Sequence, residues 1–189
     1  DKVMSSEAQA CFTYIFMPVF VISLLSQFVY QPVISKMALL WHEKKISQFN
    51  KLILRQIALI LLLSVAAIIG GYLLGIPVLS LIYGVDLTDY KKALVILLIG
   101  GGALAIVNFL QMIITVTRKQ KLLNIGYLLA FLLFVFGGKT ITEKHGMIGI
   151  SVFYTAVVMI LGAVFIVLTI GIIKGYANSD GKTVAEKKQ

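Results

Sequence analysis

Five long stretches without Asp, Glu, Lys or Arg limit what this chain can fold into more than any other feature. They cover residues 8–35, 56–85, 93–117, 122–138 and 145–173. A helix crosses the hydrocarbon core of a bilayer with about 20 apolar residues, in a usable range of about 17 to 25, and the fourth stretch only just reaches it. Apolar runs such as residues 60–69 do not alternate with polar residues as barrel strands do, so helices are the expected spanning elements. The sequence predicts an all-α, polytopic membrane protein with five transmembrane helices.

The composition agrees with a lipid environment. Hydrophobic residues make up 59% of the 189 residues, charged residues make up 13%, and the mean hydropathy is +0.97. A soluble domain of this size has too little interior to bury so much apolar surface. The predicted layout is an external segment at residues 1–7, a five-helix membrane domain at residues 8–175 and a disordered tail at residues 176–189. The expected spans cover about residues 10–35, 54–82, 93–117, 122–138 and 147–173, with an interfacial helix at about residues 42–51.

The positive charges set the expected orientation of these spans. Five spans place the two ends of the chain on opposite sides of the membrane, and twelve of the seventeen Lys and Arg residues then fall on the side of the tail. Cytoplasmic loops carry the excess of Lys and Arg, so the tail is expected in the cytoplasm and the first residues outside. A net charge of +9 would indicate nucleic-acid binding in a soluble protein. Here the cations gather at the ends of apolar runs, which favours anionic membrane lipids as partners and excludes nucleic acid.

Polar side chains inside the first and third runs are the candidate substrate-binding residues. Gln27 and Gln31 are four residues apart and share one face of a helix. Asn108, Gln111 and Thr115 follow the i, i+3, i+7 spacing and also share a face. Exposing amides to lipid is unfavourable, so these side chains are expected to face protein or a water-filled cavity. Two readings stay open for the glutamine pair, namely an interhelical hydrogen bond and the wall of a cavity.

Proline and glycine mark the predicted kinks and close contacts of the bundle. Pro18 is expected to kink the first helix, because proline removes a backbone hydrogen bond, and Pro32 is a candidate hinge or packing residue in the same run. Gly71 and Gly75 form a small-xxx-small pair that permits close helix packing. Gly101 lies at the centre of a triple glycine, for which tight packing and a hinge are both possible roles.

The sequence offers almost no chemistry for catalysis. Neither His42 nor His145 has a second His or Cys at the spacing of a metal site, and the single cysteine, Cys11, excludes an internal disulfide. The acidic residues lie outside the predicted spans, so no carboxylate inside the membrane relays protons or binds a cation. We therefore expect a passageway or a scaffold that is not an enzyme, with no catalytic residues, no metal and no cofactor.

The order of several short segments resembles a known transporter family. QPVISK closes the first run, FNKLILRQ opens the second, LSLIYG closes it, and HGMIGISV opens the last. Pro32, the Tyr83 and Gly84 pair, and the Gly146 and Gly149 pair carry the likeness, which extends over residues 1 to about 175. In this order the segments resemble the C-terminal portion of bacterial polysaccharide flippases of the multidrug/oligosaccharidyl-lipid/polysaccharide exporter superfamily.

The resemblance implies a two-lobe transporter whose central cavity opens alternately to each side of the bacterial cytoplasmic membrane. The five helices would form most of the second lobe, and the N-terminal lobe and a lipid-linked oligosaccharide would be partners. The implied activity is translocation of undecaprenyl-diphosphate-linked sugar units for surface polysaccharide export. Arg55 and Arg118 would attract the diphosphate at the cytoplasmic entrance, because Arg suits bidentate phosphate contacts. The family's cavity is typically basic, whereas no Lys or Arg lies in the middle of any run here. Either the two arginines reach the cavity mouth or the deep cations belong to the other lobe.

Three rivals remain at this point. A multidrug or metabolite exporter of the same superfamily would usually have an intramembrane carboxylate, which these residues lack. A polysaccharide polymerase or ligase would need a large external loop with catalytic residues, whereas the external loops here are short. A membrane scaffold would bind partners through its glycine faces.

Overall fold

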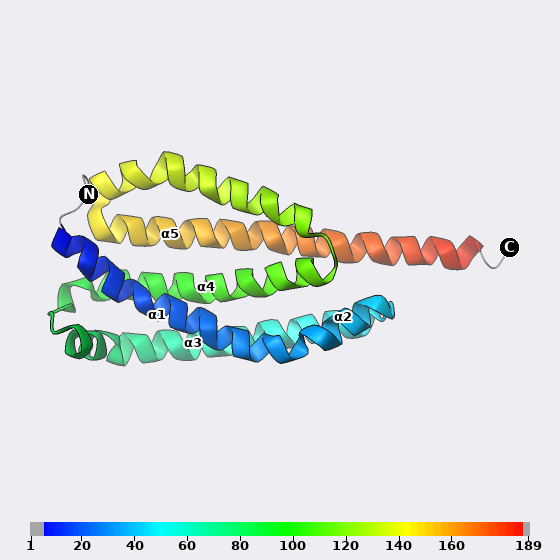
Figure 1. Ribbon diagram of the computed structural model, residues 1–189, viewed down its shortest axis with the longest axis horizontal. Coiled ribbons are helices and arrows are strands. Elements are labelled where there is room, and N and C mark those ends of the chain that lie inside the picture. Colours follow the sequence, from blue (N-terminus) through cyan, green and yellow to red (C-terminus); the bar gives the residue numbers. More distant parts are fainter. Residues whose placement is uncertain (1–5, 187–189) are drawn as a thin grey trace.

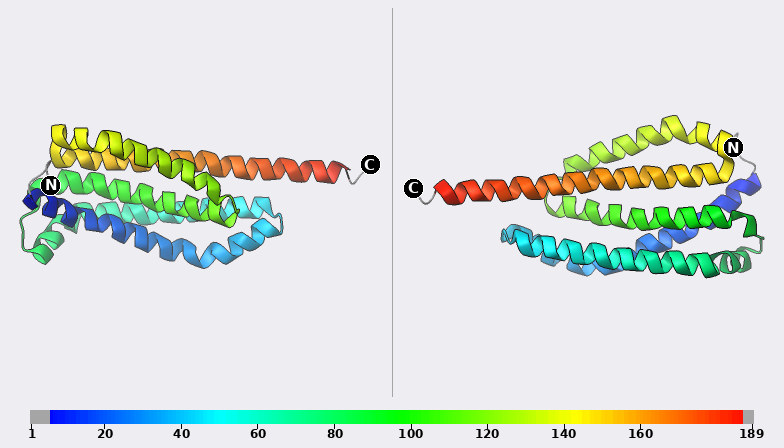
Figure 2. Two further views of the ribbon diagram at one scale, coloured as in Figure 1. Left: turned by 45° about the horizontal axis from the view of Figure 1, so that its top comes forward. Right: turned by 180° about the vertical axis from the view of Figure 1, so that it is seen from behind.

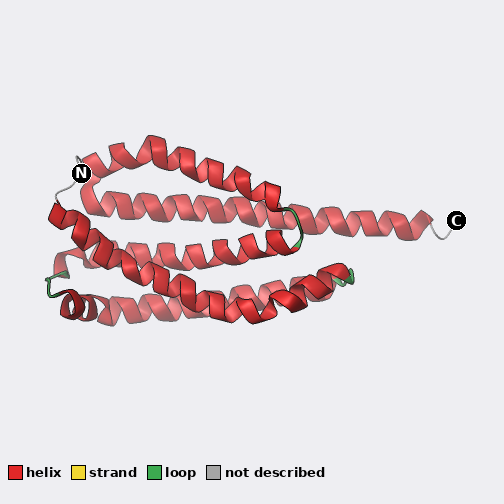
Figure 3. Ribbon diagram, in the orientation of Figure 1, coloured by secondary structure: helices red, strands yellow, loops and turns green. Residues whose placement is uncertain are grey.

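A computed structural model of the chain describes residues 6–186, and every regular element in that range is helical (Figure 3). The long elements are α1 (Ser6–Tyr30), α2 (Ile34–His42), α3 (Ile46–Tyr83), α4 (Lys91–Val116) and α5 (Leu123–Glu186). Short 3-10 turns occur at Gln31–Val33, Thr88–Tyr90 and Gln120–Leu122. The predicted all-α class is confirmed for these residues.

Helix α4 is the centre of the bundle, with α1, α3 and α5 packed around it (Figure 1). Its side chains are buried on several faces, and Leu94, Leu97, Phe109 and Ile113 are completely buried. A helix that is apolar on all faces is stable when other elements or lipid surround it. The even hydrophobicity of this segment therefore permits its central position.

The triple glycine at residues 100–102 lies where α4 meets all three neighbouring helices. An added Cβ on the first glycine would lie 2.7 Å from Thr155 Oγ1 in α5. On the second glycine it would lie 3.2 Å from Val19 Cα in α1, and on the third 3.0 Å from Ser64 Cβ in α3. Consecutive helical residues point in directions about 100° apart, so three glycines in a row open three sides of α4 to close contact.

The outward surface of the bundle is apolar, and several polar side chains face inward. Leu62, Leu74 and Leu81 of α3 are 68%, 63% and 85% exposed, whereas Ser26 and Ser64 are buried. An apolar surface of this extent is unfavourable in water and suits lipid. Four helices within the described residues are long and apolar enough to cross a membrane, and they cover Gln9–His42, Ile46–Tyr83, Thr88–Val116 and Gln120–Tyr176.

The prediction of five separate spanning helices was therefore wrong. The expected fourth and fifth spans belong to one element, α5, which folds back on itself at Gly146 (Figure 1). Residues 139–145, expected as a loop, are helical. Within them Lys139 pairs with Glu143 at 3.9 Å across one turn, and Thr142 Oγ1 donates to Gly138 O, both of which are compatible with helix. We call residues 123–145 the first arm of α5 and residues 147–186 its second arm.

The backbone at Gly146 reverses the chain in a single residue. Its φ of 56° and ψ of −142° form a conformation that residues with a Cβ rarely adopt. The two arms consequently lie side by side with no loop between them (Figure 2).

Two further predictions were wrong at the chain segments outside the spans. The interfacial helix expected at residues 42–51 does not form, because α2 ends at His42 and residues from Ile46 onward are the first turns of α3. Phe49 and Ile53 in these first turns are buried in the bundle. The tail expected to be disordered from residue 176 continues the second arm of α5 as helix to Glu186. Residues 1–5 and 187–189, in the predicted external segment and tail, lie outside the described residues.

The predicted packing glycines of α3 lie against α4. An added Cβ on Gly75 would lie 2.8 Å from Leu94 Cδ2, and one on Gly71 would collide with Leu98. Pro18 lies inside α1, which continues through it, and Pro32 lies in the 3-10 turn between α1 and α2. The turn at Pro32 thus separates α1 from α2, and the two helices together form one of the four segments that could cross a membrane.

Most cations of the described residues belong to segments at one end of the bundle, where the turns before α3 and α5 lie near the second arm (Figure 1). We call this the basic end, and its described cations are Lys36, Lys44, Lys45, Lys51, Arg55, Arg118, Lys119, Lys121 and Lys174. Among the described side chains there, Glu43 is the single acid, and it pairs with Lys45 at 2.7 Å. The basic end therefore carries a strong excess of positive charge.

Candidate functional site

A polar pocket between α1 and α4 contains most of the predicted substrate-binding residues. It has a volume of about 490 Å³. It is lined by Gln27, Tyr30, Ile34, Asn108, Gln111, Met112, Thr115 and Val116. Four of the five residues singled out from the sequence are thus brought together, and the stripe on α4 faces the glutamine on α1. We call this cavity the polar pocket.

Two of these amides connect helices. Asn108 Nδ2 donates to Ser23 Oγ in α1 at 2.8 Å, and the hydroxyl of Tyr127 in α5 donates to Gln111 Oε1 at 2.6 Å. The amides of α4 therefore tie it to α1 on one side and to the first arm of α5 on the other. Hydrogen bonds of this kind stabilise helix packing in an apolar environment.

Gln27 differs from these two residues because its amide has no partner among the described residues. It is half-buried on α1 and borders the polar pocket. Thr115, the last predicted residue, donates its hydroxyl to Gln111 O at 2.9 Å. Gln27 thus leaves the pocket with one free amide that can bind a polar ligand.

Gln31 does not line the polar pocket. It is exposed in the 3-10 turn next to Pro32, where the helix of Gln27 has already ended. Of the two glutamines, Gln27 alone lines the pocket, and the α1 helix ends between them at Tyr30.

Ser23, Tyr30 and Tyr127 belong to the site but were not found from the sequence. The buried Tyr30 packs its ring 5.5 Å from that of Phe109, and Ser23 and Tyr127 provide the hydrogen bonds described above. The hydroxyl groups of Ser23 and Tyr127 stand alone in otherwise apolar runs, which was a signal that each forms a hydrogen bond within the protein. Their pairing depends on how the helices pack, which the spacing within one helix does not contain.

A second pocket lies beside the turn between α4 and α5. It measures about 790 Å³ and is lined by Arg118, Lys119, Gln120, Lys121, Leu122, Leu168, Gly171 and Ile172. Three cations therefore line one side of this pocket, and apolar residues of the second arm line the other side. None of the three forms an ion pair with a described residue, so their charge is available to an anionic ligand.

The geometry of this turn holds the cations at the basic end. Arg118 adopts a φ of 59°, its N–H donates to Thr115 O at 3.0 Å, and the N–H of Lys119 donates to Ile114 O at 3.1 Å. Arg118 lies three residues beyond Thr115 of the polar pocket, so the two pockets occupy the same end of α4. Arg55 does not join them, since it lies on the exposed face of α3 and lines neither pocket.

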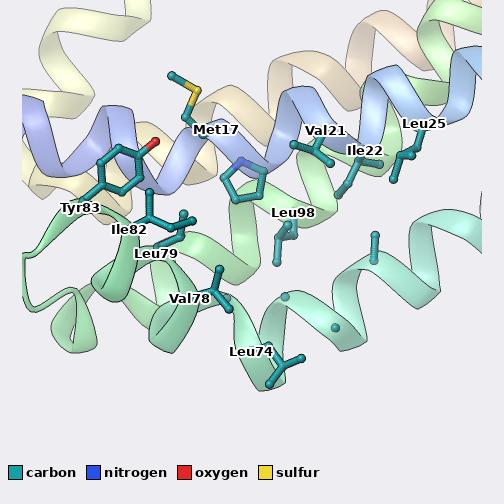
Figure 4. Close-up of a pocket in the computed structure, with 15 residues that line it drawn as sticks. Met17, Val21, Ile22, Leu25, Leu74, Val78, Leu79, Ile82, Tyr83 and Leu98 are labelled. Carbon is teal, nitrogen blue, oxygen red and sulfur yellow. The ribbon is translucent and has the colours of Figure 1, made fainter.

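An apolar groove of about 400 Å³ separates α1 from α3 (Figure 4). Met17, Val21 and Leu25 line one side, and Leu74 and Val78 line the other (Figure 4). Pro18, Gly70, Gly71 and Gly75 also border it. The groove offers no charged group and is suited only to hydrocarbon.

The connection between α3 and α4, at the opposite end of the bundle, holds an acidic turn. Asp86 Oδ1 accepts hydrogen bonds from the Thr88 hydroxyl at 2.6 Å and from the Thr88 backbone N–H at 3.0 Å. These bonds, the side-chain bond above all, lower the pKa of the Asp86 carboxyl below its usual value, because they favour the charged form.

No group of three or more His, Cys, Asp or Glu residues that could hold a metal ion occurs in the part of the chain that the structure describes. Cys11 is a buried free thiol in α1.

No protein-family model, curated protein or solved structure matches this chain. A functional conclusion must therefore rest on the pockets themselves.

Proposed function

We propose that this chain forms much of one lobe of a transporter that moves undecaprenyl-diphosphate-linked oligosaccharide units across the bacterial cytoplasmic membrane. The observation that carries the proposal is the position of two pockets at one end of α4, one lined by amides and hydroxyls and the other by three unpaired cations. A sugar linked to a diphosphate needs both kinds of surface.

Each pocket suits one part of this substrate. The free amide of Gln27 and the hydroxyl of Thr115 can replace water around sugar hydroxyls, which reduces the cost of taking them out of solvent. The Arg118 to Lys121 turn can hold the diphosphate, because Arg and Lys form short, charge-assisted hydrogen bonds with phosphate oxygens. Translocation then needs no covalent chemistry, since the protein only shields polar groups from lipid.

The proposed orientation places the basic end in the cytoplasm. Lys and Arg residues are held on that side of bacterial membranes, and the units to be exported are collected there. The two arginines enter the proposal differently, with Arg118 at the diphosphate and Arg55 at the membrane surface, where its side chain can reach the head groups.

Replacing Gln27 tests the proposal most directly. In cells whose full-length gene encodes Gln27→Leu, we expect the rate of export to fall about fivefold, which corresponds to the loss of one hydrogen bond of about 1 kcal/mol. The measurement is the pool of lipid-linked sugar in each leaflet, which should increase on the cytoplasmic side. Gln31→Leu is the matched control, because it makes the same change one helical turn away and outside the pocket.

The same assay separates the proposal from its rivals. Equal export by the two glutamine variants at equal protein levels would contradict the role of the polar pocket. Unpolymerised units on the outer leaflet of cells lacking the gene would indicate a polymerase or ligase. A normal pool in those cells would indicate an exporter of drugs or metabolites.

A further inference from the structure

A separate cleft near the basic end lies between α3 and the second arm of α5. It has a volume of about 460 Å³, and Leu110 of α4 forms part of its wall. The other lining residues are Asn50, Ile53, Leu54, Ile57, Ile166, Thr169, Ile170, Ile173 and Lys174. We call it the α3–α5 cleft, and it shares no lining residue with the two pockets of the proposed transport site.

Thr169 is exceptional among the buried hydroxyl groups of the described chain. It is 5% exposed, and its Oγ1 has no hydrogen-bond partner. The other buried Ser and Thr side chains, namely Ser23, Ser26, Ser64, Thr117, Ser151 and Thr155, all form one. Native proteins rarely leave such a group unsatisfied, so an unpaired hydroxyl lining a cleft indicates a missing ligand atom.

The body of the cleft has the polarity of a hydrocarbon chain. Residues 166–174 of the second arm extend along it, and at 1.5 Å per residue they cover about 12 Å. Leucine and isoleucine side chains form most of the wall, and the isoleucines come from both helices. Nothing in this part would bind a sugar, and an acyl chain would fill it without loss of hydrogen bonds.

The mouth of the cleft carries a charge of the opposite sign to a phospholipid phosphate. Lys174 lies there with Asn50, is exposed, and forms no ion pair with a described residue. It belongs to the basic end, whose positive charge attracts anionic head groups. Thr169 lies five residues before Lys174, about 7.5 Å deeper in the cleft along the helix. This separation is similar to that between the phosphate and an ester carbonyl of a phospholipid.

We propose that the α3–α5 cleft binds one anionic phospholipid of the surrounding bilayer. Its phosphate contacts Lys174 and Asn50, an ester carbonyl accepts the hydrogen bond that Thr169 has no partner for, and one acyl chain fills the isoleucine-lined body. The site is independent of the proposed transport function, because it needs neither the polar pocket nor the Arg118 to Lys121 turn. It fixes α3 against the second arm at the depth of one leaflet.

Native mass spectrometry of the purified full-length protein, titrated with phosphatidylglycerol or phosphatidylcholine, tests this site. We expect wild type to retain one phosphatidylglycerol in preference to phosphatidylcholine. Lys174→Gln should weaken phosphatidylglycerol binding about fivefold, because one Lys near a membrane surface contributes about a factor of this size. Lys51→Gln is the matched control, since it removes the same charge at the same end but outside the cleft.

Two further variants locate the lipid within the cleft. Thr169→Val should weaken both lipids alike, because both carry the ester carbonyl. Ile170→Trp, at a residue 47% exposed, should fill the cleft and abolish retention of the lipid. Equal losses in Lys174→Gln and Lys51→Gln, or equal binding of the two lipids by wild type, would overturn the proposal in favour of general surface attraction. A dimer in wild type that Ile170→Trp dissociates would also overturn it, because a second copy would then occupy the cleft.

Discussion

Helices α3 and α4 are almost equally apolar, yet they occupy opposite environments. In the most apolar segment of each helix, 61% of the residues of α4 are buried inside the bundle, compared with only 11% of the residues of α3. The difference comes from small residues, because α4 has glycines that open three of its sides to neighbouring helices, whereas α3 contacts α4 through one side at Gly71 and Gly75. Hydrophobicity thus indicates that a helix belongs in lipid, whereas the glycines on its surface determine how many other helices can pack closely around it.

The polar residues of the two helices differ in the same way. Asn108 of the central helix is paired with Ser23 of α1. Gln56 of α3 is 4% exposed, and its Oε1 has no hydrogen-bond partner. A surrounded helix can find partners on several sides, while a peripheral helix has few within reach. The comparison predicts opposite effects for the same kind of substitution.

The largest effect is expected for a side chain introduced into the close contact of α4. Gly101→Leu should lower the free energy of unfolding by about 3 kcal/mol, because the new side chain would collide with the backbone of α1 at Val19. Thermal unfolding of the purified protein in detergent measures the change. Gly70→Ala on α3 is the control, since no atom lies within 4 Å of its added Cβ, and there we expect no loss of stability. Equal losses in the two variants would break the comparison between the helices.

An intermediate effect is expected for the paired and unpaired amides. Asn108→Leu should destabilise the protein by about 1 kcal/mol, because it removes an interhelical hydrogen bond and leaves Ser23 without its donor. Gln56→Leu should stabilise it by about the same amount, because it removes a buried acceptor without a partner and keeps a similar volume. Both changes can be followed by the same unfolding assay. Shifts of the same sign would contradict the assignment of partners.

The smallest effect is expected in the turn that connects the two helices. Thr88→Val removes the hydroxyl that holds the pKa of Asp86 below its usual value, so that pKa should rise toward the usual value. When the pKa of a carboxyl is lower in the folded protein than in the unfolded chain, ionisation of that carboxyl stabilises the folded protein at pH values above the unfolded-state pKa. This stabilisation is lost as the pH falls through the folded-state pKa. Wild type and variant should therefore differ above the usual pKa of Asp and converge in stronger acid. Titration of the carboxyl by NMR measures the shift, and an unchanged pKa would rule out the hydrogen bond as its cause.

The sequence alone was sufficient to predict the helical class and the central part of the polar pocket. Spacing within a continuous helix placed Asn108, Gln111 and Thr115 on one face, and this is the face that borders the pocket. It did not distinguish Gln27 from Gln31, which lies in the 3-10 turn after α1 and does not line the pocket.

The number of separate long helices was wrong because charge was equated with a loop. Lys139 and Glu143 are charged, but an i, i+4 pair is compatible with helix, and the chain reverses only at Gly146. The partners Ser23 and Tyr127 were missed for another reason. A contact between helices depends on their packing, which a pattern within one helix does not contain.

The reversal at Gly146 also limits how the two arms of α5 can move. They are joined through one residue, so neither arm can shift along its axis or tilt without carrying the other with it. The arms therefore behave as one helical hairpin, with residues 139–145 at its tip. A side chain at position 146 would resist the φ of 56° and spread the arms, which would disturb their packing against α4.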